Sequence, residues 1–357
     1  MDRQHFVSVL ADWYARHGRD LPWRHTRDPY AIWLSEVILQ QTRISQGTVY
    51  WHRFMAAYPT VDALAAASED DVLKLWQGLG YYSRARNLHT AAKQIVALGH
   101  FPNTLADIRK LKGVGDYTAA AIASFVFGIR AAAVDGNAYR VLARVFGIQT
   151  AINSTEGKKE FSLLAEECVG QHIAEAATSA ATSTPFDDTA ALFNQAIMDF
   201  GATQCTPKSP LCAVCPLAEE CVALHEGTID QLPVKQKTTK VKTVHLTYIY
   251  LRVAGYTAIR RRPAGSIWQG LWEPMTQIPD GAVVTLLQQG VRHVLTHRIL
   301  LADFFLATMD HRPPLPDGYQ WVKEENLDHY AVPRLIEKLW AEVGTVNISR
   351  QVKLADR

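Results

Sequence analysis

The 357-residue sequence has few cysteines and no long apolar run. Four of its five cysteines fall between residues 205 and 221, so a scaffold stapled by disulfides is not expected. No stretch approaches the roughly 18 apolar residues of a membrane span, and none near the start resembles a secretory signal. These absences predict a cytoplasmic protein that makes no use of a membrane.

The sequence also lacks a strong excess of charge, because its formal net charge is only +2. One region nevertheless has no acidic residue, from Asp230 to Glu273. Eight basic residues lie within it: Lys235, Lys237, Lys240, Lys242, Arg252, Arg260, Arg261 and Arg262. Such a stretch is typical either of phosphate contacts or of a solvated linker beside a basic strand edge, and the sequence leaves both open.

The length predicts two or three domains, and the pattern of apolar residues divides the chain. Helical spacing dominates residues 1–224, and the Ala-rich segment 119–133 predicts a helix buried on most sides. Residues 225–243 are expected to form a linker, polar and basic from Pro233 onward.

Residues 244–350 predict an α+β domain with a tail at 351–357. Within it, strands are expected over 244–253 and 256–260 and within 293–308, and a helix over 333–343. The fold class is therefore mainly α followed by α+β. There is no internal repeat, and the one biased tract is an Ala/Thr/Ser-rich segment near 174–184.

Four clustered cysteines follow the pattern C-x6-C-x2-C-x5-C: Cys205, Cys212, Cys215 and Cys221. Two disulfides are one reading, but nothing marks the chain as secreted. A four-cysteine zinc site usually shows two C-x2-C pairs, and only one is present. The uneven, compact spacing favours a [4Fe–4S] cluster held by four thiolates. Cys168 lies far upstream and is expected to be a packed thiol.

A glycine-containing hairpin lies between an amphipathic segment and the Ala-rich helix. Gly113 and Gly115 flank Val114, an arrangement that lets backbone N–H groups approach a phosphate at a helix N-terminus. An ordinary turn between two helices has the same sequence signature. The cysteine motif downstream favours the phosphate-binding interpretation.

Two carboxylates are candidates for chemistry. Asp135, in Val-Asp-Gly-Asn, is either the N-cap of the following helix or a carboxylate facing an active cleft. Glu36 is the lone acid of an apolar helix, so it is a surface residue, a buried partner of an arginine, or an acid with a raised pKa.

Several motifs together resemble the MutY-type adenine DNA glycosylases of the helix-hairpin-helix superfamily, which includes endonuclease III. They are LPWR, WLSEVILQQT, GLGYYSRARNL, LKGVGDYT, VDGN and the cysteine loop, in register over residues 20–225. The C-terminal part resembles that family's Nudix-like domain more weakly, through RRRPAGSIWQGLWE and residues 293–297. The resemblance implies a six-helix subdomain at 22–130 and an iron–sulfur subdomain from 1–21 and 131–224.

The resemblance also implies a role for each matching residue. Glu36 would protonate adenine N7, and Asp135, supported by Asn137, would stabilise the oxocarbenium-like sugar. Tyr117 occupies the position of a catalytic tyrosine or serine, where lyase-competent relatives carry a lysine, so a monofunctional glycosylase is implied. The implied DNA-contact residues are Arg19 and Arg24 near the adenine pocket, Gln41 and Tyr81 as wedges, Leu79 and Thr42 near the opposite base, and Gly113, Val114 and Gly115 at the phosphate. The implied cluster ligands are Cys205, Cys212, Cys215 and Cys221.

The C-terminal domain departs from its relatives at two places. A Nudix hydrolase needs several glutamates to bind metal, and residues 260–300 contain only Glu273. The family's Phe-Ser-His loop, which contacts 8-oxoguanine, is Leu295-Thr296-His297 here, so Thr296 and His297 are the candidate lesion contacts. Plain strand residues are the other interpretation of these two positions.

The expected substrate is duplex DNA with adenine opposite 8-oxoguanine or guanine, bound by a monomer associated with the nucleoid. Two other functions stay open at this point. One is an endonuclease III-like glycosylase/lyase for oxidised pyrimidines, and the other is a non-catalytic iron–sulfur DNA-binding or redox module. Tyr117 and the C-terminal domain argue against the first, and the pair Glu36 and Asp135 argues against the second.

Overall fold

The computed structural model describes residues 1–170, 188–236 and 241–355, which form two compact units. Unit 1 comprises Met1–Ala65 and Thr90–Lys237, and unit 2 comprises Ala66–His89 and Thr238–Arg357. Unit 2 therefore includes a short segment of the helical half, and the domain limits expected from the sequence stay a prediction. The Ala/Thr/Ser-rich tract near 174–184 lies outside the described residues.

Unit 1 is helical, as the sequence predicts for this part of the chain. Its helices are α1 (Arg3–His17), α2 (Pro29–Leu39), α3 (Ile44–Ala57), α4 (Val61–Ala66), α7 (Leu105–Ile108), α8 (Asp116–Phe127), α9 (Gly136–Phe146), α10 (Thr155–Val169), α11 (Thr189–Thr203) and α12 (Val222–His225). Short 3₁₀ turns lie at η1 (Pro22–Arg24), η3 (Cys212–Val214) and η4 (Ala218–Glu220). Helix α6 (Ser83–Leu98) begins in unit 2 and ends in unit 1.

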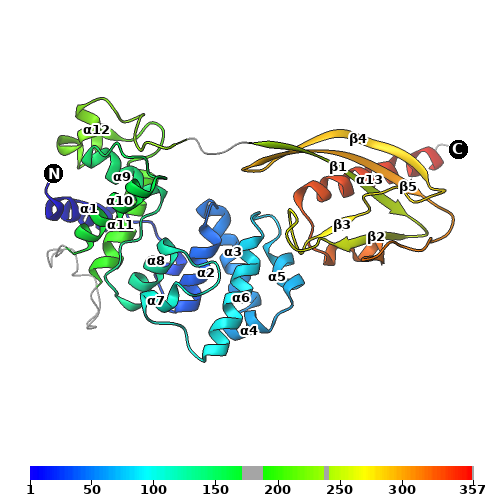
Figure 1. Ribbon diagram of the computed structural model, residues 1–357, viewed down its shortest axis with the longest axis horizontal. Coiled ribbons are helices and arrows are strands. Elements are labelled where there is room, and N and C mark those ends of the chain that lie inside the picture. The colour runs from blue at the N-terminus through cyan, green and yellow to red at the C-terminus, as the bar shows by residue number, and fades with distance from the viewer. Residues whose placement is uncertain (171–187, 237–240, 356–357) are drawn as a thin grey trace. The chain divides into compact units, whose positions relative to one another are not determined.

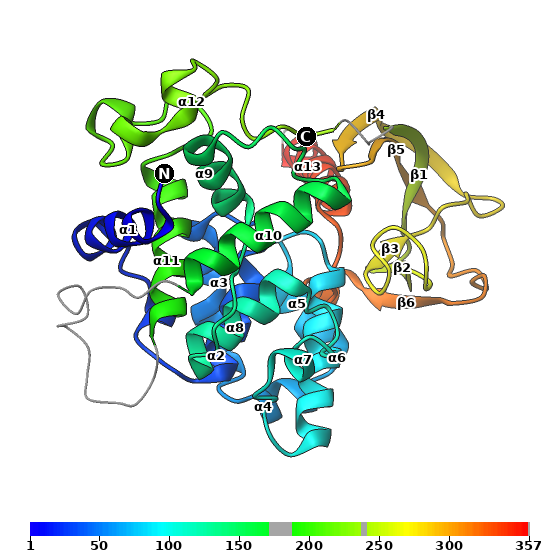
Figure 2. The same ribbon diagram turned by 60° about the vertical axis from the view of Figure 1, so that its left-hand side comes forward.

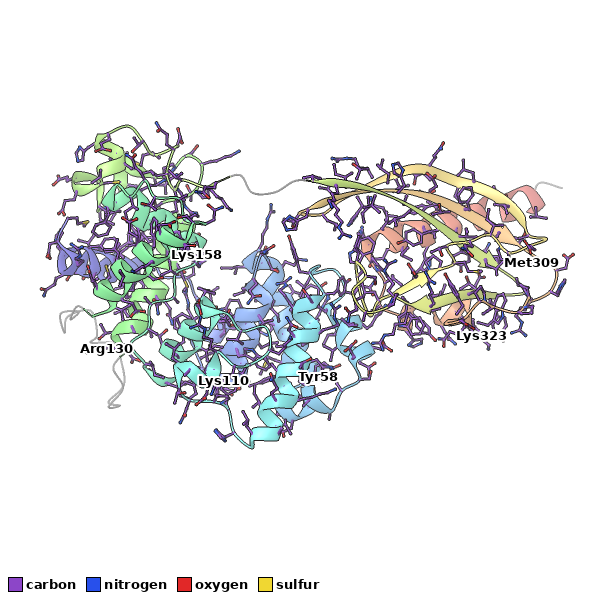
Figure 3. The ribbon with its side chains drawn as sticks, in the orientation of Figure 1. Tyr58, Lys110, Arg130, Lys158, Met309 and Lys323 are labelled. Atoms are coloured by element: carbon purple, nitrogen blue, oxygen red, sulfur yellow. The ribbon has the colours of Figure 1, made fainter. Side chains whose placement is uncertain are left out.

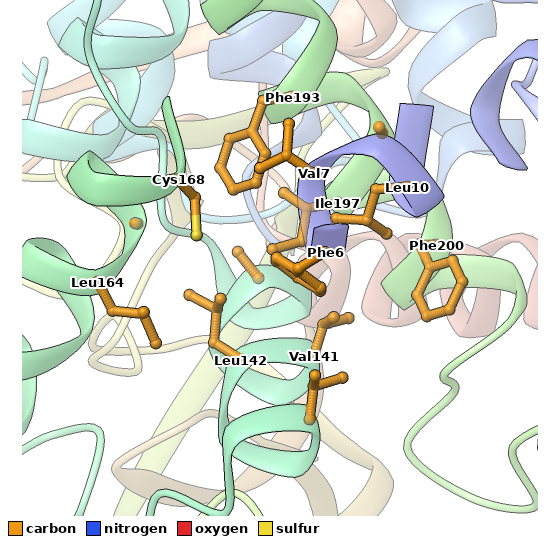
Figure 4. Close-up of a cluster of buried hydrophobic side chains, with 14 of the residues drawn as sticks. Phe6, Val7, Leu10, Val141, Leu142, Leu164, Cys168, Phe193, Ile197 and Phe200 are labelled. Atoms are coloured by element: carbon orange, nitrogen blue, oxygen red, sulfur yellow. The ribbon is translucent and has the colours of Figure 1, made fainter. Parts of the chain in front are cut away.

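Two groups of packed helices make up unit 1. Helix α11 packs against α1, α9 and α10, which gather around it in Figure 2, while α2 packs against α3 and α8. The first group encloses a core of large apolar side chains that includes Phe6, Leu142 and Phe193 (Figure 4). Cys168 points into the same core and is fully buried, which confirms that it is a packed thiol.

The Ala-rich helix is shorter than the sequence pattern predicts. Helix α8 ends at Phe127, because Gly128 adopts a left-handed conformation with φ of 64° and caps it. Residues 129–133 are therefore not helical but lead toward Asp135, although several of their side chains are buried. The prediction was wrong because the apolar sequence continues beyond the end of the helix. Gly128, within that sequence, is the residue that ends it.

Unit 2 combines two three-stranded sheets with helices. Its elements are α5 (Glu69–Trp76), β1 (Lys242–Arg252), β2 (Tyr256–Arg261), β3 (Trp272–Pro274), β4 (Val283–Val294), β5 (Arg298–Thr308), β6 (Tyr319–Lys323), η5 (Glu324–His329) and α13 (Arg334–Ala355). One sheet has the order β1-β5-β4, with β1 and β5 parallel and β4 antiparallel to β5. The other has the order β3-β2-β6 and is antiparallel.

Helix α13 packs on the first sheet, as Figure 1 shows. Its apolar residues, such as Leu335 and Leu339, meet Tyr248 and Phe304 from the strands in one core. The helix begins at Arg334 as expected but continues to Ala355, well past the predicted end at 343. Met309 and Lys323, at the ends of β5 and β6, lie at one end of this unit (Figure 3). No described helix is long and apolar enough to cross a membrane.

Candidate active site and DNA-contact surfaces

Glu36 is a buried acid near the middle of α2. The helix starts at Asp28, whose carboxylate accepts hydrogen bonds from the backbone N–H groups of Tyr30 and Ala31, with Pro29 in the first turn. Residues from Tyr30 to Ile38 are all buried, so this register puts the carboxyl inside the protein. Burial raises the pKa of Glu36 to about 7, because the charged form loses its hydration. The carboxyl can therefore hold a proton near neutral pH.

Tyr117 hydrogen-bonds to that carboxyl. Its phenolic O–H donates to Oε2 of Glu36 at 2.9 Å from the first turn of α8. Burial, followed by the nearby charges of Glu36 and Asp135, raises the pKa of Tyr117 well above its usual value. The tyrosine therefore stays protonated and orients Glu36. There is no amine at this position.

Asp135 is both a helix cap and a lining residue of the cavity that contains Glu36. Its carboxylate accepts from the backbone N–H groups of Asn137 and Ala138 at 2.9 and 2.8 Å, and so caps α9. The side-chain amide of Asn137 donates to Oδ2 of Asp135 at 2.7 Å. The two readings of Asp135 in the sequence are therefore compatible. Burial raises its pKa, while these hydrogen bonds oppose the rise by favouring the carboxylate.

One cavity of about 920 Å³ is lined by all of these groups. The charge of Asp135 contributes to the raised pKa of Glu36, so the two carboxyls lie close enough to interact. Two neighbouring carboxyls titrate as a coupled pair. Burial raises the pKa of both, while the hydrogen bonds from Asn137 and Ala138 favour the ionised form of Asp135. The cavity is large enough for a small ligand and carries one proton donor and one candidate carboxylate.

Two arginines of the cavity meet a third buried acid, Asp199 of α11. Arg24 donates to both carboxylate oxygens of Asp199 at 2.8 Å, and Arg19 binds the same carboxylate through its backbone and side chain. Burial would raise the pKa of Asp199, but the two guanidinium groups hold it below its usual value. Asp199 thus fixes both arginines at the wall of the cavity.

The loop after α2 brings two more predicted residues to this cavity. Gln41 has a φ of 57°, which is unusual for a residue other than glycine, and its side chain is exposed. Thr42 lines the cavity beside it. The side-chain amide of Gln40 donates to Thr118 Oγ1 at 3.1 Å and ties this loop to α8.

The predicted glycine hairpin is present between α7 and α8. Gly113 has a φ of 81°, Val114 donates a backbone hydrogen bond to Leu111, and Gly115 is the N-cap residue of α8. A Cβ atom at Gly115 would meet nothing in the protein, so packing does not require glycine there. Exposed basic residues flank the helix on both sides, Lys110 before it and Arg130 after it (Figure 3).

The four clustered cysteines lie together after α11. The sulfurs of Cys205, Cys212 and Cys221 each raise the pKa of the Cys215 thiol, after burial as the main cause, so all four are neighbours. Within the described residues, no His, Cys, Asp and Glu side chains converge tightly enough to hold a single metal ion. Four neighbouring thiols fit a [4Fe–4S] cluster, which takes one thiolate at each iron.

Two arginines of α9 connect the cysteine loop to Asn137. Arg140 donates to Asn137 Oδ1, to the carbonyl of Gly201 and to the carbonyl of Cys205, at 2.7–2.8 Å. Arg144 is almost fully buried, contacts Cys205 Sγ at 3.5 Å and donates to the carbonyl of Thr206 at 2.7 Å. One turn apart on the same helix, they hold the loop and the Asp135–Asn137 pair in a single rigid element.

Unit 2 holds the remaining predicted contact residues around a second pocket of about 620 Å³. Tyr81, Thr296 and His297 line it, and the hydroxyl groups of Tyr81 and Thr296 lie 2.9 Å apart. Leu79 is buried in the same loop as Tyr81. Trp268 supplies an aromatic wall, with a φ of 59° and a T-shaped contact to His293.

Glu273 is the one glutamate between residues 260 and 300, and it is engaged by two arginines. This glutamate is buried and accepts from Arg260 Nε at 2.8 Å and from Arg262. Both carboxylate oxygens of Glu273 thus pair with guanidinium groups. That this domain does not hydrolyse pyrophosphates stays a prediction.

Several residues of these sites were missed in the sequence. Asp199 is a lone acid in an apolar helix, the same signal that singled out Glu36. Arg140 and Arg144 are an i, i+4 pair of arginines in a largely apolar helix. This spacing could have indicated buried arginines that donate hydrogen bonds inside the protein. Trp268 carried no signal, because its left-handed backbone is visible only in the structure.

Comparison with known protein families identifies the class. Residues 34–167 match the HhH-GPD superfamily of base excision DNA repair proteins, residues 205–221 match the iron–sulfur binding domain of endonuclease III, and residues 247–342 match the NUDIX domain. The protein is a helix-hairpin-helix base-excision protein with a [4Fe–4S] cluster and a C-terminal Nudix-like domain.

Comparison with curated proteins narrows this class to one family. The adenine DNA glycosylase of Buchnera aphidicola from Schizaphis graminum is 32% identical over 75% of this chain and 73% of its own length. That from Acyrthosiphon pisum is 28% identical over 95% of this chain and 97% of its own. The human adenine DNA glycosylase is 41% identical over 64% of this chain, which spans only 41% of the human protein. The chain belongs to the adenine DNA glycosylase family.

Solved structures agree with the fold of the helical part. A thermostable thymine-DNA glycosylase is similar with a TM-score of 0.54 and 30% identity, over 63% of this chain and 97% of its own. A trapped endonuclease III–DNA covalent intermediate is similar with a TM-score of 0.51 and 20% identity, over 64% and 99%. At that identity the second likeness shows the shared fold alone.

Proposed function

We propose that this protein is a hydrolytic DNA N-glycosylase that removes adenine paired with 8-oxoguanine or guanine in duplex DNA. The observation that carries the proposal is a buried and a partly buried carboxyl in one cavity, with the pKa of Glu36 raised to about 7 and Asp135 held by three hydrogen bonds. Family membership supports adenine as the base. A protein that acts on DNA in this way would associate with the nucleoid.

Glu36 is suited to protonate the leaving base. Adenine leaves poorly as an anion, so a donor that is still protonated near pH 7 lowers the barrier, typically by a factor of about 10²–10⁴. Tyr117 holds the carboxyl in place through its hydrogen bond at 2.9 Å. Since the base must leave the helical stack to reach a cavity, the substrate nucleotide is expected to be flipped.

Asp135 is suited to the opposite task. Its carboxylate, fixed by two backbone N–H groups and by Asn137, can face a sugar that develops positive charge as the glycosidic bond breaks. Arg19 and Arg24 stay fixed by Asp199 at the cavity wall, where they can orient the base.

The division of one acid and one carboxylate also bears on strand cleavage. A lyase of this superfamily attacks the sugar with an amine to form a Schiff base. The cavity presents a phenol at 117, and no lysine is among the described residues that line it. We therefore propose a monofunctional enzyme that leaves an intact abasic strand.

The cluster and the hairpin are proposed to bind DNA rather than to take part in bond cleavage. The hairpin of Gly113, Val114 and Gly115 leads directly into α8, and a phosphate would be favoured at the N-terminus of that helix. The [4Fe–4S] cluster would hold the loop of residues 205–221 in shape. No acid of the cavity lies in that loop.

Recognition of the base opposite adenine is proposed for Thr296 and His297, together with Tyr81, Gln41, Leu79 and Thr42. 8-Oxoguanine differs from guanine by the O8 atom and the N7 hydrogen, which a hydroxyl or an imidazole can contact. One or two hydrogen bonds, at about 0.5–1.5 kcal/mol each, correspond to a preference of about one to two orders of magnitude.

One assay tests the whole proposal. Purified full-length protein, expected as a monomer, is incubated with duplexes that contain adenine opposite 8-oxoguanine, adenine opposite guanine, or thymine glycol, and the strands are examined with and without alkali. We expect free adenine and a strand that breaks only after alkali. Cleavage of the thymine glycol strand without alkali would instead indicate an endonuclease III-like glycosylase/lyase, and no product from any duplex would leave a binding module.

A further inference from the structure

The loop that presents Tyr81 is held in an unusual backbone conformation. It connects α5 to α6, and Gly78, Gly80 and Tyr81 have φ values of 103°, 72° and 46°. For tyrosine this left-handed conformation is unfavourable and persists only where the surroundings enforce it. The side chain is also about half exposed, so packing of the ring alone does not enforce it.

Arg84 binds this loop from beneath. It lies in the first turn of α6 with 8% of its surface exposed, and Nη2 donates to the carbonyls of Leu79 and Gly80 at 3.3 Å each. Trp76 Nε1 donates to the carbonyl of Gly80 as well, at 3.0 Å. The two carbonyls that precede Tyr81 are therefore fixed by the guanidinium, and one of them also by the indole.

The same guanidinium lies against two aromatic rings. Its Cζ atom is 5.0 Å from the ring centre of Trp76 and 5.6 Å from that of Tyr81. Burial lowers the pKa of Arg84 to about 10, so the group still carries its charge at neutral pH. Cation–π contacts of this kind are stronger when desolvated. The ring of Tyr81 thus rests on a buried cation, while its hydroxyl lies 2.9 Å from Thr296 Oγ1.

We propose that Arg84 is a positioning residue that fixes the ring of Tyr81 for insertion into the duplex and thereby sets the preference for 8-oxoguanine over guanine. This inference rests on the proposed function. A ring that is already ordered loses less conformational freedom when it stacks on a base. The held ring also keeps its hydroxyl beside Thr296, so wedge and lesion contact act together.

The chemistry of the guanidinium makes a specific prediction about substitution. Arg84 donates to both carbonyls from a single nitrogen while its planar guanidinium lies against two rings. Lysine can supply a cation, but its compact ammonium group has no planar face to stack on the rings. Methionine retains much of the apolar stem and supplies neither. Arg84→Lys should therefore preserve part of the effect and Arg84→Met none of it.

The test is a double-mutant cycle in the full-length protein with Arg84→Met, Tyr81→Ala and the combination. The readouts are single-turnover rates of adenine release opposite 8-oxoguanine and opposite guanine, and the affinity for a duplex with non-hydrolysable 2′-fluoroadenosine opposite 8-oxoguanine. Base–aromatic stacking predicts about a tenfold or larger loss of affinity and preference for Tyr81→Ala. Arg84→Met should lose about tenfold alone but less than about twofold in the Tyr81→Ala background.

A matched control exists in unit 1. Arg53 lies 5.3 Å from the ring of Tyr50 in α3, a pair of the same kind away from both pockets. Arg53→Met should leave the ratio of the two rates unchanged. Should Arg84→Met fail to fold, as judged by iron content and thermal unfolding, Arg84→Lys with and without Tyr81→Ala makes the same comparison.

The outcomes separate this inference from the function it rests on. Additive losses in the cycle, or an unaltered 8-oxoguanine preference in Arg84→Met, would overturn the role of Arg84. A wild-type protein that releases no adenine would overturn the proposed function instead. In that event the affinity measurements still show whether Arg84 acts through Tyr81.

Discussion

The cavity of unit 1 and the pocket of unit 2 are both lined by polar side chains, but these side chains differ in their exposure to water. In the cavity, Glu36 and Asp135 are withdrawn from water, and burial raises the pKa of each. In the pocket, Tyr81 and Thr296 are exposed and touch each other through their hydroxyl groups. Burial changes the chemistry of a group, whereas exposure leaves it ready to contact a ligand. The difference predicts bond cleavage in unit 1 and discrimination in unit 2.

The largest effect on the cavity of unit 1 should come from Glu36→Gln, which keeps the shape of the side chain but removes its acidic proton. Loss of a general acid predicts a fall in single-turnover adenine release of about 10²-fold or more, with DNA affinity nearly unchanged. Activity within about tenfold of wild type would show that another group protonates the base. Thr296→Ala is the companion variant, because it should not affect this step.

The cluster offers the next test, because it belongs to unit 1 alone. Purified protein is expected to contain about four iron and four sulfide ions per chain, as a [4Fe–4S] cluster requires. Cys212→Ser should lower iron content and DNA affinity, whereas Cys168→Ser should retain full iron because that thiol packs in the apolar core. Stoichiometric zinc in the wild-type protein would contradict the assignment.

The pH dependence sharpens the assignment of the acid. Glu36 must be protonated to act, so adenine release should fall as pH rises through about 7, the raised pKa of this carboxyl. Asp135 must be ionised, so release should also fall toward acidic pH. In Glu36→Gln the residual activity should lose the basic limb only. A wild-type rate that is flat from pH 6 to 9 would rule out Glu36 as the donor.

Stability should respond to the same pKa with a definite sign. Because folding raises the pKa of Glu36 from 4.5 to about 7, the folded protein loses stability as pH rises through this range. The change corresponds to at most about 3 kcal/mol. Glu36→Gln should therefore be more stable than wild type at pH 8 by up to that amount, and the gain should vanish near pH 4.5.

Asp199 is the internal control for this measurement, which is made by denaturant unfolding at several pH values. Its pKa is lowered by the two arginines, so its ionised form favours folding and the sign is reversed. Asp199→Asn should destabilise the protein at neutral pH. If both substitutions destabilised it equally, burial of Glu36 would not be the source of its raised pKa.

The smallest expected effect belongs to the pocket of unit 2. Thr296→Ala combined with His297→Ala should reduce the preference for 8-oxoguanine over guanine by about tenfold, since one or two hydrogen bonds of about 0.5–1.5 kcal/mol are lost. Release opposite guanine should hardly change. A double variant that discriminates as well as wild type would assign lesion reading to Gln41 and Thr42 in unit 1.

Features of the fold and the site that depend on a local sequence pattern could be predicted from the sequence. The lone acid Glu36 in an apolar helix stood out as a candidate, with a surface position and a buried one both left open, and the cysteine spacing predicted the cluster. The prediction was wrong about the end of the Ala-rich helix, because apolar character continued past Gly128. Arg84 and Trp268 could not be found in the same way. Their roles depend on a left-handed backbone conformation and on aromatic rings that folding brings together. Neither feature produces a periodic pattern in the sequence.

Because Asp135 also caps a helix, different substitutions at this position should have different effects on folding and on activity. The carboxylate caps the N-terminus of α9 through two backbone hydrogen bonds, and asparagine caps helices about as well as aspartate. If Asp135 has the proposed role, a change to asparagine would therefore give a folded protein that binds its DNA substrate without releasing adenine. A change to alanine would also weaken the helix and lower the amount of protein. Two substitutions at one residue would thus give different phenotypes: inactive protein that stays bound to DNA in the case of asparagine, and a reduced amount of folded protein in the case of alanine.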